Sequence, residues 1–156
     1  KRMKKGFTLV ELLVVIAVIA VLAAVTVVAV NPAKKLAQAR DAARKSAIQQ
    51  IVTSLSTFYT QNTSYPAASA DLVTNGELKN LPKGPTGADF SYVVNPSACT
   101  TAGKNCTGAA IYDTYEQPTT ACATGTAYWG WTSGSGVIGK ICTAGTPAYS
   151  DVPVVD

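Results

Sequence analysis

Glu11 is an ionisable side chain close to the start of a long apolar segment. From Leu12 to Val30 the only polar side chain is Thr26. A run of this length is close to the roughly 20 residues that a helix needs to cross a bilayer. A carboxylate that reaches the membrane core costs on the order of 2.5–3.5 kcal/mol. Because insertion alone gives no reason for an acid here, the sequence predicts that Glu11 has a partner.

The residues around this acid resemble a known family. The string KKGFTLVELLVVIAVIAVLAA, which begins at Lys4, resembles the N-terminus of type IV pilins and of the pseudopilins of related secretion systems. The resemblance implies that a basic leader peptide, residues 1–6, ends at Gly6 and is removed by a prepilin peptidase. It also implies that the new first residue, Phe7, is N-methylated. Glu11 is then expected to meet the Phe7 amino group of a neighbouring subunit during assembly.

Two other interpretations of these residues stay open. Glu11 could be a carboxylate that snorkels to the membrane interface. Gly6 and Phe7 could belong to a Sec-type signal peptide that is cut later, at small residues such as Ala23 and Ala24. An acid inside the apolar region of such a signal peptide argues against the second interpretation.

Length and charge limit the domain organisation and the classes of function that the chain could have. The 156 residues allow one domain plus a tail, and residues 1–30 are not available to its core. The formal net charge is +4, but four basic side chains lie within residues 1–5. Without them the basic and acidic side chains balance, so the charge does not favour nucleic acid as a partner. There is no His, the commonest general base, and no catalytic pair stands out. We therefore expect a protein that is not an enzyme and has no cofactor or metal.

The cysteines indicate the compartment of the C-terminal half. They are Cys99, Cys106, Cys122 and Cys142. None forms a C-x-x-C pair, so zinc spacing is absent. An even count behind a membrane segment predicts two disulfides in an oxidising compartment, which places this half outside the cytoplasm. Three pairings are possible. Short loops close at lower entropic cost, which favours Cys99–Cys106 and Cys122–Cys142. Reduced, buried thiols are the alternative.

Apolar content and length predict the first of two helical halves, and periodicity predicts the second. Residues 7–30 predict a membrane-spanning helix, because in lipid the backbone must satisfy its own hydrogen bonds. Residues 31–62 predict an amphipathic continuation with an apolar stripe at three- and four-residue spacing. Pro32 either ends the first helix or kinks one long helix. The strong helical pattern that follows favours the kink.

Residues 63–156 predict a globular head with a small antiparallel sheet. The expected strands are 90–94, 109–115, 127–132 and 137–142, with a hairpin turn at 133–136. A short helix at 68–75, capped by Ser69, is expected before them. The predicted fold class is α+β: a long N-terminal helix, membrane-spanning in its first half, that packs its amphipathic second half on a sheet with disulfide-linked loops.

Three groups of side chains are weaker candidates for sites. Five aromatic residues could form a ligand patch but fit cross-strand packing better: Tyr112, Tyr115, Tyr128, Trp129 and Trp131. Four acidic residues could include calcium ligands, as in some pseudopilins, although their spacing matches no metal loop: Asp113, Glu116, Asp151 and Asp156. A basic band could touch DNA, but lipid phosphates and neighbouring acidic side chains are nearer partners: Lys34, Lys35, Arg40, Arg44 and Lys45.

These features favour a structural subunit of a type IV pilus or a related filament. We expect a single-pass precursor in the inner membrane, with its head outside the cytoplasm, that polymerises with itself into a cell-surface filament. The resemblance implies a prepilin peptidase and a membrane assembly platform as partners, and the lipid bilayer before assembly. One alternative is a pseudopilin of a type II secretion or DNA-uptake machine. Another is a membrane-tethered extracellular binding domain that does not polymerise.

Overall fold

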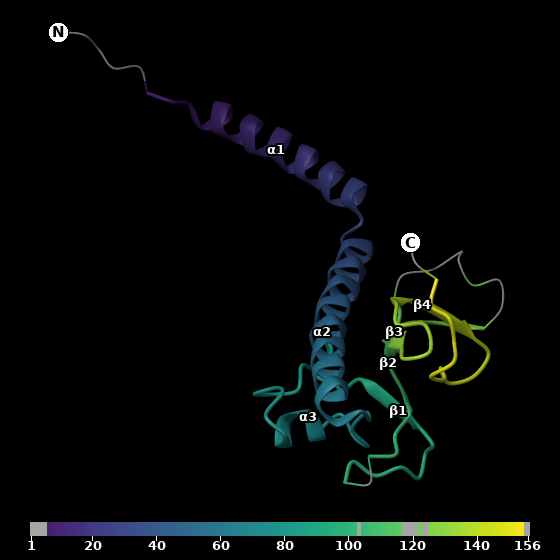
Figure 1. Cartoon of the computed structure of the whole chain (residues 1–156). Coiled ribbons are helices and arrows are strands. Elements are labelled where there is room, and N and C mark those ends of the chain that lie inside the picture. Colours follow the sequence, from purple (N-terminus) through teal and green to yellow (C-terminus); the bar gives the residue numbers. More distant parts are fainter. Residues whose placement is uncertain (1–5, 103, 117–121, 123–124, 155–156) are drawn as a thin grey trace. The chain divides into compact units, whose positions relative to one another are not determined.

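The computed structural model describes residues 6–102, 104–116, 122 and 125–154 (Figure 1). The chain divides into two compact units, Lys1–Ala37 and Gln38–Asp156, and each is described by itself. The order of elements is α1 (Leu9–Val30), α2 (Pro32–Asn62), α3 (Asp71–Thr74), β1 (Ser91–Asn95), β2 (Gly108–Thr114), β3 (Thr126–Thr132) and β4 (Ile138–Thr143). The helices followed by an antiparallel sheet confirm the α+β class.

Helix α1 is apolar apart from Glu11 and Thr26, and residues 9–28 are exposed. Residues Leu9–Val28 are long and apolar enough to cross a membrane, as judged by length and composition alone. Valines and isoleucines, which lose rotamer freedom in a helix, make up much of this run, and none of its residues is buried within the chain. Its apolar surface is therefore available to lipid or to other helices.

The helix is interrupted at Asn31, so the expectation of one continuous, kinked helix is wrong. Asn31 has a left-handed backbone (φ 45°, ψ 76°) and ends α1, a conformation that Asn tolerates better than most residues. Its side-chain oxygen accepts the N–H of Lys34 (3.3 Å) and its carbonyl accepts the N–H of Lys35 (3.2 Å). Asn31 thus caps a new helix that has Pro32 at its first position, where a missing N–H is harmless.

The core lies between α2 and the sheet. The apolar stripe of α2 places Ile48, Ile51, Leu55 and Phe58 in a buried cluster with residues of β2 and β3. Ile48, Ile51 and Leu55 have no exposed surface. Burying a side chain of this kind stabilises a fold by about 1.5–3 kcal/mol. The amphipathic half of the helical region therefore packs on the sheet, as the periodicity predicts.

The sheet is an antiparallel meander in the order β1-β2-β3-β4. Each strand lies within one or two residues of the range expected from the sequence. The turn between β3 and β4 is closed by a hydrogen bond from Gly136 N–H to the Thr132 carbonyl (2.9 Å), with Gly136 at φ +69°. A left-handed residue at this point suits glycine, so the hairpin turn is confirmed.

The aromatic residues are packed within the sheet rather than gathered in one open patch. Trp129 and Trp131 belong to the core and are 5% and 4% exposed. Tyr115 stacks on Trp129 with ring centroids 6.2 Å apart. Tyr112 and Tyr128 form a separate edge-to-face pair at 5.4 Å. Gly130 separates the two tryptophans, and a Cβ there would lie 2.5 Å from the Ile111 carbonyl oxygen, so the strands approach closely only because this residue is glycine.

Two disulfides cross-link the segments that connect and flank the strands of the sheet. Cys99 is bonded to Cys106, and Cys122 to Cys142, so both bonds join sequence neighbours. Cys106 is fully buried and its carbonyl accepts the N–H of Tyr65 (2.9 Å). The first bond therefore closes a loop within the β1–β2 connection, and the hydrogen bond from Tyr65 joins this loop to the segment that follows α2.

Two local features differ from the sequence expectations. Helix α3 spans only Asp71–Thr74, and no side chain caps it, so the expected cap at Ser69 is wrong. The carboxylate of Asp71 instead accepts the N–H of Ala68 (3.2 Å). The C-terminal segment, whose sequence has no clear period, pairs with β4 through two backbone hydrogen bonds between Lys140 and Val154. This pairing covers part of an edge strand.

Candidate functional site

The Gly6–Phe7 peptide bond lies just before α1, outside helical structure. Residues 6–8 have no regular secondary structure, and α1 begins at Leu9. Phe7 is 83% exposed. Among the described residues, apart from its chain neighbours, no atom lies within 4 Å of the position that a Cβ on Gly6 would occupy. The bond is therefore accessible to a protease without unwinding of the helix.

Glu11 closes a capping box with Thr8 at the start of α1. The Thr8 hydroxyl accepts the N–H of Glu11 (3.3 Å). In return, Oε2 of Glu11 accepts both the Thr8 N–H (2.9 Å) and the Thr8 hydroxyl (2.7 Å). Within one chain, the partner of Glu11 is thus the first turn of the helix itself. This arrangement satisfies backbone donors that a helix start otherwise leaves without partners.

The capping box leaves half of the carboxylate available. Both hydrogen bonds from Thr8 reach Oε2, and no hydrogen bond to Oε1 occurs among the residues that the structure describes. Glu11 is also exposed. A positioned carboxylate with one uncommitted oxygen can accept a hydrogen bond from a cation without losing its cap. The geometry is therefore compatible with a second partner that approaches from outside the chain.

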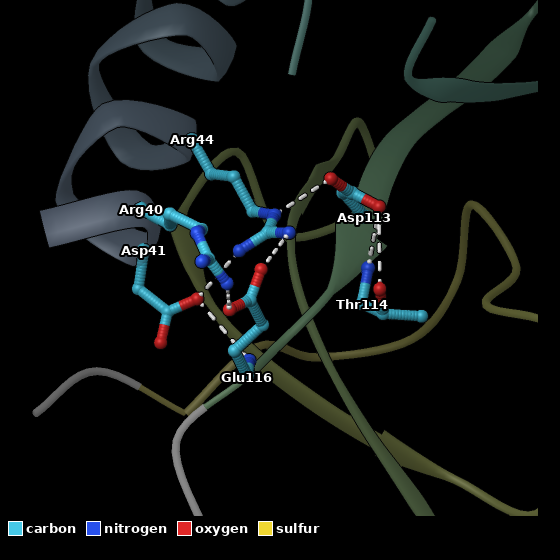
Figure 2. Close-up of polar contacts among 6 residues, drawn as sticks. All are labelled: Arg40, Asp41, Arg44, Asp113, Thr114 and Glu116. Carbon is cyan, nitrogen blue, oxygen red and sulfur yellow. Dashed lines mark hydrogen bonds and ion pairs between the residues drawn. The ribbon is translucent and has the colours of Figure 1, made fainter. Parts of the chain in front are cut away.

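A second charged cluster, the Arg44 cluster, lies between α2 and the end of β2 (Figure 2). Its members are Arg40, Asp41, Arg44, Asp113 and Glu116. The guanidinium of Arg44, whose side chain is 4% exposed, contacts three carboxylates: Asp41 (2.9 Å), Asp113 (2.8 Å) and Glu116 (2.5 Å). The cluster therefore ties the helix to the sheet through residues far apart in sequence.

Additional contacts close the Arg44 cluster. Arg40 contacts the other oxygen of Glu116 at 2.8 Å. The backbone N–H of Glu116 donates to the Asp41 carboxylate (3.1 Å). Burial by itself would lower the pKa of Arg44, but hydrogen bonds to Glu116 and Asp113 raise that pKa above its ordinary value. The hydrogen bond from Arg44 lowers the pKa of Glu116. Both groups thus stay charged, as a buried charge pair requires.

The Arg44 cluster contains side chains from two of the weaker site candidates, the basic band and the acidic group. Arg40 and Arg44 of the basic band are engaged by acidic side chains of the same chain. Lys45 lies over the Trp129 ring, 4.6 Å from its centroid. Among the residues that the structure describes, no group of three or more His, Cys, Asp or Glu is arranged to hold a metal. Asp151 accepts the N–H of Ala148 (2.8 Å), and Asp156 lies outside the described residues.

Acidification is expected to weaken the head through Glu116. Its folded-state pKa lies below the ordinary value of 4.5, so the folded state binds the proton less well than the unfolded chain does. The stabilisation is therefore present above pH 4.5 and is lost as the pH falls through the lowered pKa. We expect Glu116→Gln to flatten the acid side of a plot of unfolding free energy against pH. Urea titrations of the full chain in detergent at several pH values measure this.

Glu77→Gln is the matched control for that experiment. Glu77 forms no ion pair among the described residues, and the substitution removes the same charge. A steep acid dependence that persists in Glu116→Gln, or that is lost equally in Glu77→Gln, would show that the Arg44 cluster does not cause it.

Sequence reasoning missed two features of these sites. The capping box was readable, because Thr8-Leu9-Val10-Glu11 fits the pattern of Ser or Thr followed three residues later by an acid. The Arg44 cluster had only a weak signal: two arginines one helical turn apart and acids at the end of an expected strand. Nothing local indicates that Arg44 meets Asp113, which is 69 residues away.

The comparison with known families concerns the same N-terminal residues. Residues 1–27 match the prokaryotic N-terminal methylation motif. This is the class III leader of type IV pilins and pseudopilins. The motif supports a type IV pilin-like or pseudopilin precursor. The chain has no significant match among curated proteins or solved structures.

Proposed function

We propose that this protein is a structural subunit of a type IV pilus or a closely related filament. The precursor is anchored by α1 in the inner membrane, with residues 38–156 outside the cytoplasm. Prepilin peptidase cuts between Gly6 and Phe7, and the new amino group is methylated. The mature subunits then polymerise with themselves on a membrane platform, burying the apolar surface of α1 in the filament.

The observation that carries this proposal is the N-terminal methylation motif. Two structural features support it: an exposed Gly6–Phe7 bond and a carboxylate at the start of α1. The motif covers residues 1–27, and the Gly6–Phe7 bond precedes the helix in exposed chain. Glu11 then presents a carboxylate oxygen at the helix start. A head-to-tail contact between one chain's carboxylate and the next chain's amino group does not close on itself, so repeated contacts build a filament.

Electron microscopy of fibres sheared from cells, with intact-mass measurement of their subunit, tests the proposal. The expected subunit begins at Phe7, carries one added methyl group, and forms fibres on its own. Recovery of the protein only from membranes, with correct processing and no fibres, would indicate a pseudopilin or a tethered domain. A mature N-terminus at Ala24 or beyond would indicate a Sec-type signal peptide.

Gly6→Val is expected to block processing almost completely. A β-branched side chain would crowd the position before the cut, where the family motif has a residue without a Cβ. The substitution should leave the precursor folded, because no atom lies within 4 Å of the added Cβ. Pulse labelling followed by gel mobility and mass spectrometry reports the fraction of precursor that is cut.

Gly145→Val is the matched control, since Gly145 also has open space around its Cβ position. We expect normal processing of this variant. Efficient cleavage of Gly6→Val at the Gly6–Phe7 position would contradict the proposed site.

A further inference from the structure

Lys34 and Lys35 stand directly behind the segment that is able to cross a membrane. That segment ends at Val28, and the Asn31 cap then holds the backbone of both lysines in the first turn of α2. Both side chains are exposed. Lys34 is the sixth residue beyond the end of the segment. The headgroup layer is roughly 5–8 Å thick on each side of the hydrocarbon core, and a lysine stem reaches back several ångströms.

The other three cations of the basic band contact side chains of the same chain, whereas no such contact is seen for Lys34 and Lys35 within the described residues. Arg40 and Arg44 contact carboxylates of the same chain, and Lys45 lies over Trp129. Among the residues that the structure describes, neither Lys34 nor Lys35 takes part in an ion pair. Neighbouring positions carry no acid until Asp41. Two exposed ammonium groups that form no ion pair among the described residues therefore follow the membrane-length segment within seven residues.

We propose that Lys34 and Lys35 form a binding surface for anionic lipid headgroups of the outer leaflet of the inner membrane. The two ammonium groups hold phosphate-bearing headgroups beside the precursor while it waits in the bilayer. Assembly into a filament must then release these lipids. The inference rests on the proposed function in one respect, namely that Leu9–Val28 spans a membrane.

Electron spin resonance of labelled lipids measures this preference directly. The full chain, with its leader peptide, is reconstituted in phosphatidylcholine vesicles that contain trace spin-labelled phosphatidylglycerol or phosphatidylcholine. Lipid in contact with the protein gives a motionally restricted signal. Its ratio for the two labels gives the relative association constant. The leader peptide is the same in all variants, so its own lipid contacts cancel in the comparison.

We expect the full chain to prefer phosphatidylglycerol and Lys34→Gln/Lys35→Gln to lose much of that preference. The expected change is about fivefold for each lysine that reaches the headgroups, and it should shrink at high salt. Lys79→Gln/Lys104→Gln is the matched control, because both of these lysines are exposed in the head unit. This control should keep the preference of the unaltered chain.

Each other outcome overturns the inference in a distinguishable way. An unchanged preference in Lys34→Gln/Lys35→Gln would show that the lysines do not hold lipid. If that variant also formed fewer fibres, the lysines would serve a neighbouring subunit instead. An absence of any restricted lipid signal would mean that α1 does not insert, and the membrane stage of the proposed function would fail as well.

Discussion

Glu11→Ala is expected to abolish most filament formation while the precursor still inserts and is processed. Removing the carboxylate eases insertion, because no charge need enter lipid. In a filament, however, the amino group of a neighbouring Phe7 would be buried without its counter-ion. Breaking a buried pair from one side typically costs about 3–5 kcal/mol. Because the penalty recurs at every subunit, elongation should suffer far more than the stability of the free chain.

The capping box makes a sharper experiment possible. Glu11→Ala also removes the hydrogen bonds to Thr8, and loss of a cap costs about 1 kcal/mol. Thr8→Ala breaks the side-chain part of the same cap and leaves the carboxylate in place. We expect Thr8→Ala to form fibres in near-normal amounts. Glu11→Gln keeps an oxygen that can accept the Thr8 N–H but has no charge, and it should be impaired nearly as much as Glu11→Ala.

The measurement compares the membrane pool with the sheared-fibre fraction for each of the three variants, after intact-mass confirmation of processing. Equal losses in Thr8→Ala and Glu11→Ala would mean that Glu11 acts through the helix start alone. Normal fibre yield from Glu11→Ala would mean that the carboxylate does not drive assembly, and would favour the tethered domain.

The sequence was informative wherever one physical requirement dominated a segment. An apolar run of membrane length permits little besides a helix, and the structure has α1 there. The three- and four-residue spacing of Ile48, Ile51 and Leu55 predicts a buried stripe, and those residues are buried. Alternating strands with a glycine-rich turn predict the β3–β4 hairpin, and the structure has it. For the cysteines, loop entropy favoured the pairing that the structure shows.

Expectations were wrong or absent where two requirements competed or where partners are distant in sequence. At Asn31-Pro32 the helical pattern on both sides argued for continuity, but a capping Asn before a proline is better suited to begin a new helix. The Lys140–Val154 pairing has no periodic signal, because a single bridge needs no repeating pattern. The Arg44 cluster depends on which strand end meets which helical turn, and only the folded chain determines that.

Arg44→Met is expected to destabilise the head more than any other single substitution in the charged cluster. Arg44 contacts Asp41, Asp113 and Glu116 with a side chain that is 4% exposed. Methionine fills much of the space but brings no charge. The three carboxylates would then repel one another, with one arginine left to balance their charge. Removing one side of a buried charge pair costs about 3–5 kcal/mol. That is a large part of the roughly 5–15 kcal/mol that stabilises a typical domain.

Arg40→Met, one helical turn earlier, is the matched control. The Arg40 side chain is 42% exposed and, among the described residues, its one ion pair is with Glu116; exposed pairs contribute about 0–1 kcal/mol. Urea titration of the full chain in detergent, followed by the fluorescence of Trp129 and Trp131 in the core, should separate the two variants by at least about 2 kcal/mol. Equal stability of the two would mean that Arg44 is not the central charge. Adding Asp113→Asn to Arg44→Met should recover part of the loss, because the surplus negative charge is then reduced. A loss that Asp113→Asn leaves unchanged would point to packing of the arginine stem, not to its charge.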